Sequence, residues 1–160
     1  MGRLALGLCV ISLLSVEPLT AQEPAAPQTV PPAELRSAIE HLGDLDYAIR
    51  TNAARTVRRV PAAQAVPALL QAVSDLSDGY ARYRALVLLT GFNDPRTTDA
   101  MRESLGSPND RLRTVAYSFF EHHPDPAMIP QFLTALGKEQ ADFVRPALVR
   151  ALRALKRKAA

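Results

Sequence analysis

Four arginines recur along this chain at almost constant spacing, separated by 32, 31 and 32 residues. Each follows an aspartate by three or four residues, and we call the set the Asp/Arg ladder. Its members are Asp46 with Arg50, Asp78 with Arg82, Asp110 with Arg113, and Asp142 with Arg145. Regularly spaced guanidinium groups could clamp a carboxylate-rich ligand. A structural role explains both residue types better, because aspartate caps helix N-termini and an Asp–Arg bond could join neighbouring units.

A second group of polar residues, Glu121, His122 and His123 with Asp125 nearby, contains side chains that bind metals. Adjacent residues on a helix point about 100° apart, so the two histidines cannot hold one ion together. His123 also falls where the other repeats carry an apolar residue, which favours a histidine at a helix end. We therefore expect no metal and no other cofactor.

The common catalytic motifs are absent from the sequence. It contains no Gly-x-Ser-x-Gly, no glycine-rich phosphate loop and no His-Glu-x-x-His. No acid–base pair is fixed by its spacing, although a site assembled from distant residues would not show in spacing. We therefore expect a protein without catalysis of its own, with an enzyme as the alternative.

The elements that must position these residues are helices. A period in the low thirties is typical of a solenoid, in which each repeat buries its apolar face against its neighbours. We number positions from the residue before each ladder arginine, which is offset 0. The residues at offsets 0, 4, 7, 8 and 11 are mostly apolar, and this spacing places them on one face of a helix. The four stripes are Ile49, Ala53, Thr56, Val57, Val60; Ala81, Ala85, Leu88, Leu89, Phe92; Leu112, Ala116, Phe119, Phe120, His123; and Val144, Leu148, Ala151, Leu152, Leu155. We expect these second helices to begin near Tyr47, Gly79, Asp110 and Asp142.

A first helix precedes each of them. The four segments are Leu35–Leu42, Val66–Val73, Thr98–Leu105 and Ile129–Leu136. Gly43, Gly106 and Gly137 follow or end three of these segments, and we expect left-handed caps there because glycine adopts that conformation at least cost. The fold class is therefore all-α, an α-solenoid of four helical hairpins. The domain spans 33–156, with repeats at about 31–60, 61–93, 94–124 and 125–155.

Two motifs in these repeats carry a family resemblance. Asp-Pro-x-x-Val/Ile-Pro-x-Leu/Phe-Leu-x-Ala-Leu, followed by Asp-x-x-Val-Arg-x-x-Ala, resembles the short bacterial HEAT repeat, including the HEAT-like repeats of phycobilin-lyase relatives. The segment Asp125–Leu155 matches most closely. The resemblance implies HEAT-like hairpins with first helices on the convex side and second helices on the concave side. It says little about function, because the motif is the scaffold itself.

That resemblance also defines the alternative to a protein without catalysis, namely an enzyme or enzyme accessory similar to HEAT-like bilin lyases. Some HEAT-like hydroxylases hold iron through His-Glu dipeptides. Here the only such pairs are reversed, as Glu40-His41 and Glu121-His122, which argues against an iron enzyme.

The N-terminal residues indicate export. Met1-Gly2-Arg3 gives a positive start, Leu4–Leu14 is uncharged and apolar, and a cleavage point follows Ala21, so residues 1–21 read as a signal peptide. An uncleaved anchor is the alternative, but the apolar run is short for a membrane span. Residues 22–32 are a proline-rich linker and residues 157–160 a basic tail. We expect a periplasmic or extracellular protein without stable membrane insertion after cleavage.

The net charge is +3, and the basic excess is concentrated near the C-terminus. Cations at a helix C-terminus complement the helix dipole, so this excess does not by itself indicate nucleic-acid binding. No nucleic-acid partner is expected.

The remaining candidate is the outward surface of the second helices, at offsets 2, 6 and 9. These positions hold Thr51, Arg55, Arg58; Tyr83, Val87, Thr90; Thr114, Ser118, Glu121; and Pro146, Arg150, Arg153. Tyrosine and arginine are frequent binding anchors. We therefore predict a protein-interaction scaffold whose partner, an acidic protein segment, contacts the predicted concave face. The proposed contact residues are Arg55, Arg58, Tyr83, Val87, Arg150 and Arg153.

Overall fold

The structure is a computed structural model that describes residues 28–159. Within that range the chain contains helices and no strand. The helices are α1 (Pro32–Glu40), η1 (His41–Gly43), α2 (Tyr47–Arg59), α3 (Ala62–Asp75), α4 (Gly79–Leu89), α5 (Arg96–Ser104), α6 (Asp110–His122), η2 (Pro126–Met128), α7 (Ile129–Lys138) and α8 (Arg145–Ala159). The predicted all-α solenoid is confirmed. The predicted signal peptide, residues 1–21, and linker residues 22–27 lie outside the described residues.

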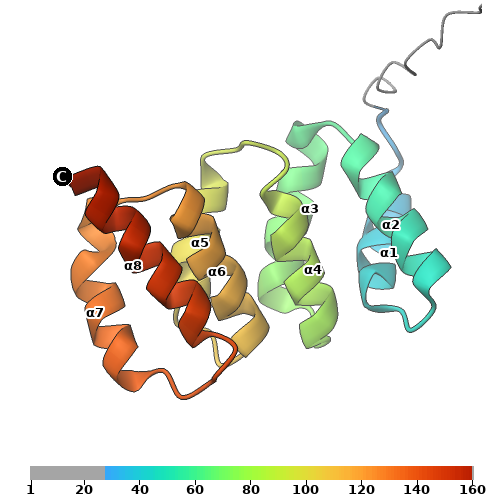
Figure 1. The fold of residues 1–160 in the computed structure, drawn as a ribbon. Coiled ribbons are helices and arrows are strands. Elements are labelled where there is room, and N and C mark those ends of the chain that lie inside the picture. Colours follow the sequence, from blue (N-terminus) through green and yellow to red (C-terminus); the bar gives the residue numbers. More distant parts are fainter. Residues whose placement is uncertain (1–27, 160) are drawn as a thin grey trace, which may run out of the picture.

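Four antiparallel helix pairs stack side by side, α1 with α2, α3 with α4, α5 with α6 and α7 with α8 (Figure 1). The second helices α2, α4, α6 and α8 form one row, nearest the viewer, and α1, α3 and α5 lie behind it (Figure 1). We call the exposed side of that row the second-helix face. The loops within pairs lie along the lower edge of the view, and the loops between pairs lie along the upper edge (Figure 1).

Polar caps begin three of the second helices close to the predicted positions. Asp46 accepts hydrogen bonds from the backbone N–H groups of Ala48 and Ile49, and so caps α2. Asp78 caps α4 in the same way. Asn109, rather than the ladder residue Asp110, caps α6. Helix α8 begins at Arg145, three residues after Asp142, because residues 142–144 form a turn.

The apolar stripes form the core between successive pairs. Ala85 and Ala116 are fully buried, so second helices approach one another closely at these alanines. Ile49 is an exposed member of its stripe, at 43%, whereas the equivalent residues Leu112 and Val144 are at most 1% exposed. Ile49 lies in the first pair, and no preceding pair within residues 28–159 covers it.

The expected left-handed glycine caps are wrong. No glycine in residues 28–159 has a positive φ, and Asn93 is the residue there that does, at 49°. Gly43 serves a different purpose, because a Cβ at this position would overlap the Asp78 carboxylate and lie 3.2 Å from the Ala81 Cβ. Glycine therefore permits the first pair to pack tightly against α4.

The predicted linker and tail boundaries also change. Pro32 is the first residue of α1, where its missing N–H loses no helical bond. Before it, the backbone N–H of Gln28 donates to the carbonyl of Arg59, and Gln64 bonds both backbone groups of Val30. The described end of the linker is thus held against the domain. At the other end, residues 157–159 are the last turn of α8 rather than a separate tail, since no helix-breaking residue precedes them.

Candidate functional site

The ladder arginines Arg50 and Arg82 bond to backbone carbonyls of their own helix pair. Nη1 of Arg50 donates to the carbonyl oxygens of Asp44 and Leu45, both at 2.7 Å. Nε of Arg82 donates to the carbonyl of Val73 at 2.6 Å. These carbonyls lie at or just beyond the C-terminal end of the first helix, where no helical donor reaches them.

The other two ladder arginines do the same. Arg113 donates to the carbonyl of Ser107 at 2.8 Å, and Arg145 to those of Leu136 and Glu139 at 3.3 and 2.8 Å. Each arginine therefore ties the start of a second helix to the end of its own first helix. The expected Asp–Arg bond between repeats is wrong. Among residues 28–159, the one ladder pair that forms an ion pair is Asp110–Arg113, within a single helix.

A different acidic residue binds a ladder arginine across the boundary between the third and fourth pairs. Glu139, the C-cap residue of α7, accepts two hydrogen bonds from Arg113 of α6. These bonds lower the pKa of Glu139 below its usual 4.5 and raise that of Arg113. The ladder arginines thus make hydrogen bonds within their helix pairs, and Arg113 also binds Glu139, a residue that the repeat spacing did not indicate.

The histidine cluster is also occupied by structural contacts. His123 is the C-cap residue of α6, and its ring stacks on that of Phe119 with 4.2 Å between centroids. Glu121 forms an ion pair with Arg150 at 2.8 Å, while His122 is exposed. Among residues 28–159 there is no group of three or more His, Cys, Asp or Glu side chains placed to hold a metal ion.

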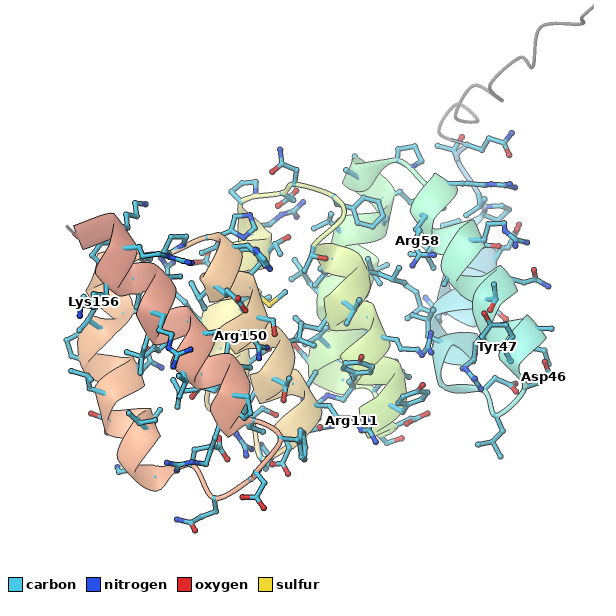
Figure 2. The ribbon with its side chains drawn as sticks, in the orientation of Figure 1. Asp46, Tyr47, Arg58, Arg111, Arg150 and Lys156 are labelled. Atoms are coloured by element: carbon cyan, nitrogen blue, oxygen red, sulfur yellow. The ribbon has the colours of Figure 1, made fainter. Side chains whose placement is uncertain are left out.

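The predicted outward positions are all accessible, since none of the twelve is buried. Figure 2 shows Arg58, Arg111 and Arg150 on this face, on α2, α6 and α8. The structure brings three of the six predicted contact residues together in one pocket between α2, α4 and α6. We call it the arginine–tyrosine pocket, and its rim consists of Arg58, Tyr80, Tyr83, Arg84, Val87 and Arg111.

The pocket wall is made of stacked aromatic rings held by cations. Tyr80 and Tyr83 lie one turn apart on α4 and stack with 5.8 Å between centroids. Arg84 donates to the Tyr80 hydroxyl at 3.1 Å, and its guanidinium lies 5.1 Å from that ring centroid. Arg111, from α6, lies 5.7 Å from the Tyr80 centroid and 6.0 Å from that of Tyr83. Such cation–π contacts fix a guanidinium against a ring without neutralising it.

The pocket carries uncompensated positive charge. None of Arg58, Arg84 and Arg111 forms an ion pair with a carboxylate among residues 28–159, and no acidic side chain lines the pocket. Nε of Arg84 is buried without a hydrogen-bond acceptor. The hydrogen bond from Arg84, with the nearby charges of Arg84, Arg50 and Arg111, lowers the pKa of the Tyr80 hydroxyl. An anion is the complementary ligand for this arrangement.

The other three predicted contact residues lie elsewhere. Arg55 is exposed on α2 and donates to Asn52 on its own helix. Arg150 and Arg153 line a shallow hollow on α8 with Asp142, and Arg150 is already paired with Glu121. The continuous row predicted from the sequence is therefore divided into the arginine–tyrosine pocket and a separate basic surface on α8.

Tyr80, Arg84 and Arg111 are functional candidates that the sequence analysis missed. They lie at offsets −1 and 3, which are about 60–100° around the helix from the positions opposite the apolar stripe. Flank positions of one second helix meet those of the next, so they line the grooves between helices. The signal was available, because an aromatic and a basic residue, Tyr80 and Arg84, stand four positions apart on one flank of α4.

A second cavity lies on the other side of the molecule, between the first helices α1 and α3. It has a volume of about 360 Å³, and Leu35, Ile39 and Leu76 give it a mainly apolar lining, with Arg36 and Gln71 also in its wall. Unlike the arginine–tyrosine pocket, it contains acidic as well as basic side chains.

None of the described helices is long and apolar enough to cross a membrane.

A protein-family model described as HEAT repeats matches residues 33–119, more than half of the chain. The match begins within α1 and ends within α6, so it includes the helices that form the arginine–tyrosine pocket. A comparison with curated proteins finds no match.

Proposed function

Because this chain belongs to the HEAT-repeat family, whose stacked helices form a scaffold of the protein-interaction type, we propose that it is an exported interaction module whose partner binds the second-helix face. The observation that carries this proposal is the arginine–tyrosine pocket. Three helices that are separated in the sequence contribute two tyrosines to it, and three arginines that form no ion pair among residues 28–159. Tyrosine and arginine are enriched among the residues that dominate binding energies.

The partner that fits this face is an acidic protein segment. Arg58, Arg84 and Arg111 attract negative charge, and the basic residues of α8 extend that attraction along the same face. Two members of the histidine cluster are engaged in structural contacts, Glu121 in an ion pair with Arg150 and His123 in a stack on Phe119 at the end of α6. We therefore propose binding without catalysis.

The test is a pair of double variants that change charge on opposite faces. Arg58→Glu with Val87→Glu alters the pocket rim, and both side chains are exposed, so the melting temperature should stay close to that of the wild type. The matched control is Arg36→Glu with Gln71→Glu, which alters the cavity between α1 and α3. The rim variant should lose the partner in a pull-down while the control retains it. Loss of the partner only in the control would move the binding surface to the first helices.

Export is a separate part of the proposal, supported by the sequence of residues 1–21. The mature protein should begin near Gln22, which the intact mass of material from the native host would show. A full-length species that retains Met1 in the membrane fraction would contradict export with cleavage.

A further inference from the structure

The arginine–tyrosine pocket has the size of a single side chain. Its volume is about 200 Å³, and it opens onto the second-helix face. Sites for drug-sized molecules and cofactors occupy about 300–1,000 Å³. The pocket is therefore suited to one residue projecting from a longer ligand rather than to a complete cofactor.

The floor of the pocket is apolar. Leu42 of η1, Ala54 of α2 and Leu88 of α4 form it. All three belong to the core and are at most 6% exposed, so the floor is well packed from below and offers no hydrogen-bonding side chain. A polar group placed on this floor would lose its hydrogen bonds to water, whereas an apolar group would gain contacts.

The rim is cationic, and two of its three arginines are held in place. Arg84 is held by the Tyr80 hydroxyl, and Arg111 lies against the Tyr80 and Tyr83 rings. The guanidinium of Arg111 has no hydrogen-bond acceptor among residues 28–159, so its donors are available to a ligand. Because these groups are already positioned, a carboxylate that binds them pays little additional conformational entropy.

We propose that the pocket recognises an apolar side chain flanked by carboxylates: the apolar group rests on Leu42, Ala54 and Leu88, and the carboxylates pair with the rim arginines. This inference rests on the proposed function and adds the local chemistry that the partner must supply. A segment with acidic residues alone would leave the floor uncovered. An apolar segment alone would leave the arginines unpaired.

Three synthetic peptides separate these contributions. The first is a fluorescein-labelled nine-residue probe with a central leucine between two pairs of aspartates and Gly-Ser ends. The second replaces leucine by serine and keeps the charge, and the third replaces the aspartates by asparagine and keeps the leucine. By fluorescence polarisation at low salt, the first probe should bind about fivefold more tightly than the second and about tenfold more tightly than the third. Equal binding of the first and second probes would reduce the site to non-specific charge attraction and overturn the proposal, as would no binding of the first.

Matched variants place the effect at the pocket. Arg111→Glu and Arg58→Glu should each weaken the first probe about tenfold, whereas Arg55→Glu, with the same charge change on α2 outside the pocket, should weaken it less than about twofold. Equal losses for Arg58→Glu and Arg55→Glu would contradict the pocket. If the natural partner is lost on changing Arg55 and Arg150 but retained in Arg58→Glu and Arg111→Glu, the second-helix face binds it and only the pocket inference fails. A single-stranded oligonucleotide that displaces the labelled first probe as well as the unlabelled first peptide does would show that the rim binds anions in general, and would also overturn the proposal.

Discussion

Arg113 and Glu139 join the third helix pair to the fourth through two parallel hydrogen bonds. Nε and Nη2 of Arg113 each lie 2.9 Å from a different carboxylate oxygen of Glu139. The two side chains are only 16% and 6% exposed. Glu139 also accepts a hydrogen bond from the backbone N–H of Ala141. Because both charges are largely removed from water, each depends on the other for its stability in the fold.

Removing one partner of this pair should destabilise the protein. Arg113→Ala leaves the Glu139 carboxylate without its counter-ion and also frees the carbonyl of Ser107, so we expect a loss of about 2–4 kcal/mol in the free energy of unfolding. The exposed neighbour Arg111 provides the control, and Arg111→Ala should cost under about 1 kcal/mol. Urea denaturation measures both. Equal losses would show that the pair does not hold the third and fourth helix pairs together.

The same pair predicts a pH dependence with a definite sign. The pKa of Glu139 is lowered in the folded protein, so its ionised form stabilises the fold. That contribution is complete above its usual pKa of 4.5 and is lost as the pH falls further, through the lowered pKa of the folded state. Glu139→Gln should therefore be less stable than the wild type at neutral pH, and the difference should shrink below pH 4.5. A difference that is independent of pH would contradict an ionic role for Glu139.

Gly43 and Gly137 should respond in opposite directions to alanine. At Gly43 the added Cβ would collide with the Asp78 carboxylate and crowd Ala81, so Gly43→Ala should cost about 1–3 kcal/mol. At Gly137, inside α7, nothing beyond the neighbouring residues and the backbone of the helix itself lies within 4 Å of the added Cβ, so Gly137→Ala should stabilise by about 0.5–1 kcal/mol. Thermal melts of the two variants would decide this. Similar shifts in both would show that the first pair does not pack tightly against α4.

Close contact between second helices makes Ala116 intolerant of a larger residue. Ala116→Leu should lose about 1–3 kcal/mol through overpacking, because the alanine is fully buried in α6. The same substitution at exposed Ala63 of α3 should change the stability by less than about 0.5 kcal/mol. The stability difference between the two, measured by denaturant titration, should exceed about 0.5 kcal/mol. A wild-type melting curve for Ala116→Leu would place the helix interface elsewhere.

The repeat spacing was sufficient to predict the helix pairs, because the apolar stripes and the starts of the second helices follow from local periodicity. Tyr47, Gly79 and Asp110 begin second helices at the predicted residues. What spacing could not predict are contacts between units. The Arg113–Glu139 pair connects residues 26 positions apart, which breaks the regular ladder. Gly43 likewise has its role in a contact with the next unit rather than in its own turn.

The candidate site was predicted only in part for the same reason. Arg58, Tyr83 and Val87 lie on the outward side of their helices, at the positions opposite the apolar stripe, and those positions can be counted from the sequence. Tyr80 and Arg111 lie on helix flanks, and they approach one another only because α4 and α6 are adjacent. A single-helix projection does not contain that neighbour, so it could not show a pocket between helices.

Site-specific photo-crosslinking tests the central claim, that the partner binds the second-helix face, most directly. A photo-reactive amino acid is placed at position 87 on α4 or, as the control, at position 71 on α3, and the protein is irradiated in its native compartment. The account predicts one defined adduct from position 87, formed with an acidic segment of the partner. The yield of this adduct should fall as the salt concentration rises, because salt screens the attraction between the arginines and the partner. A defined adduct from position 71, with none from position 87, would contradict it.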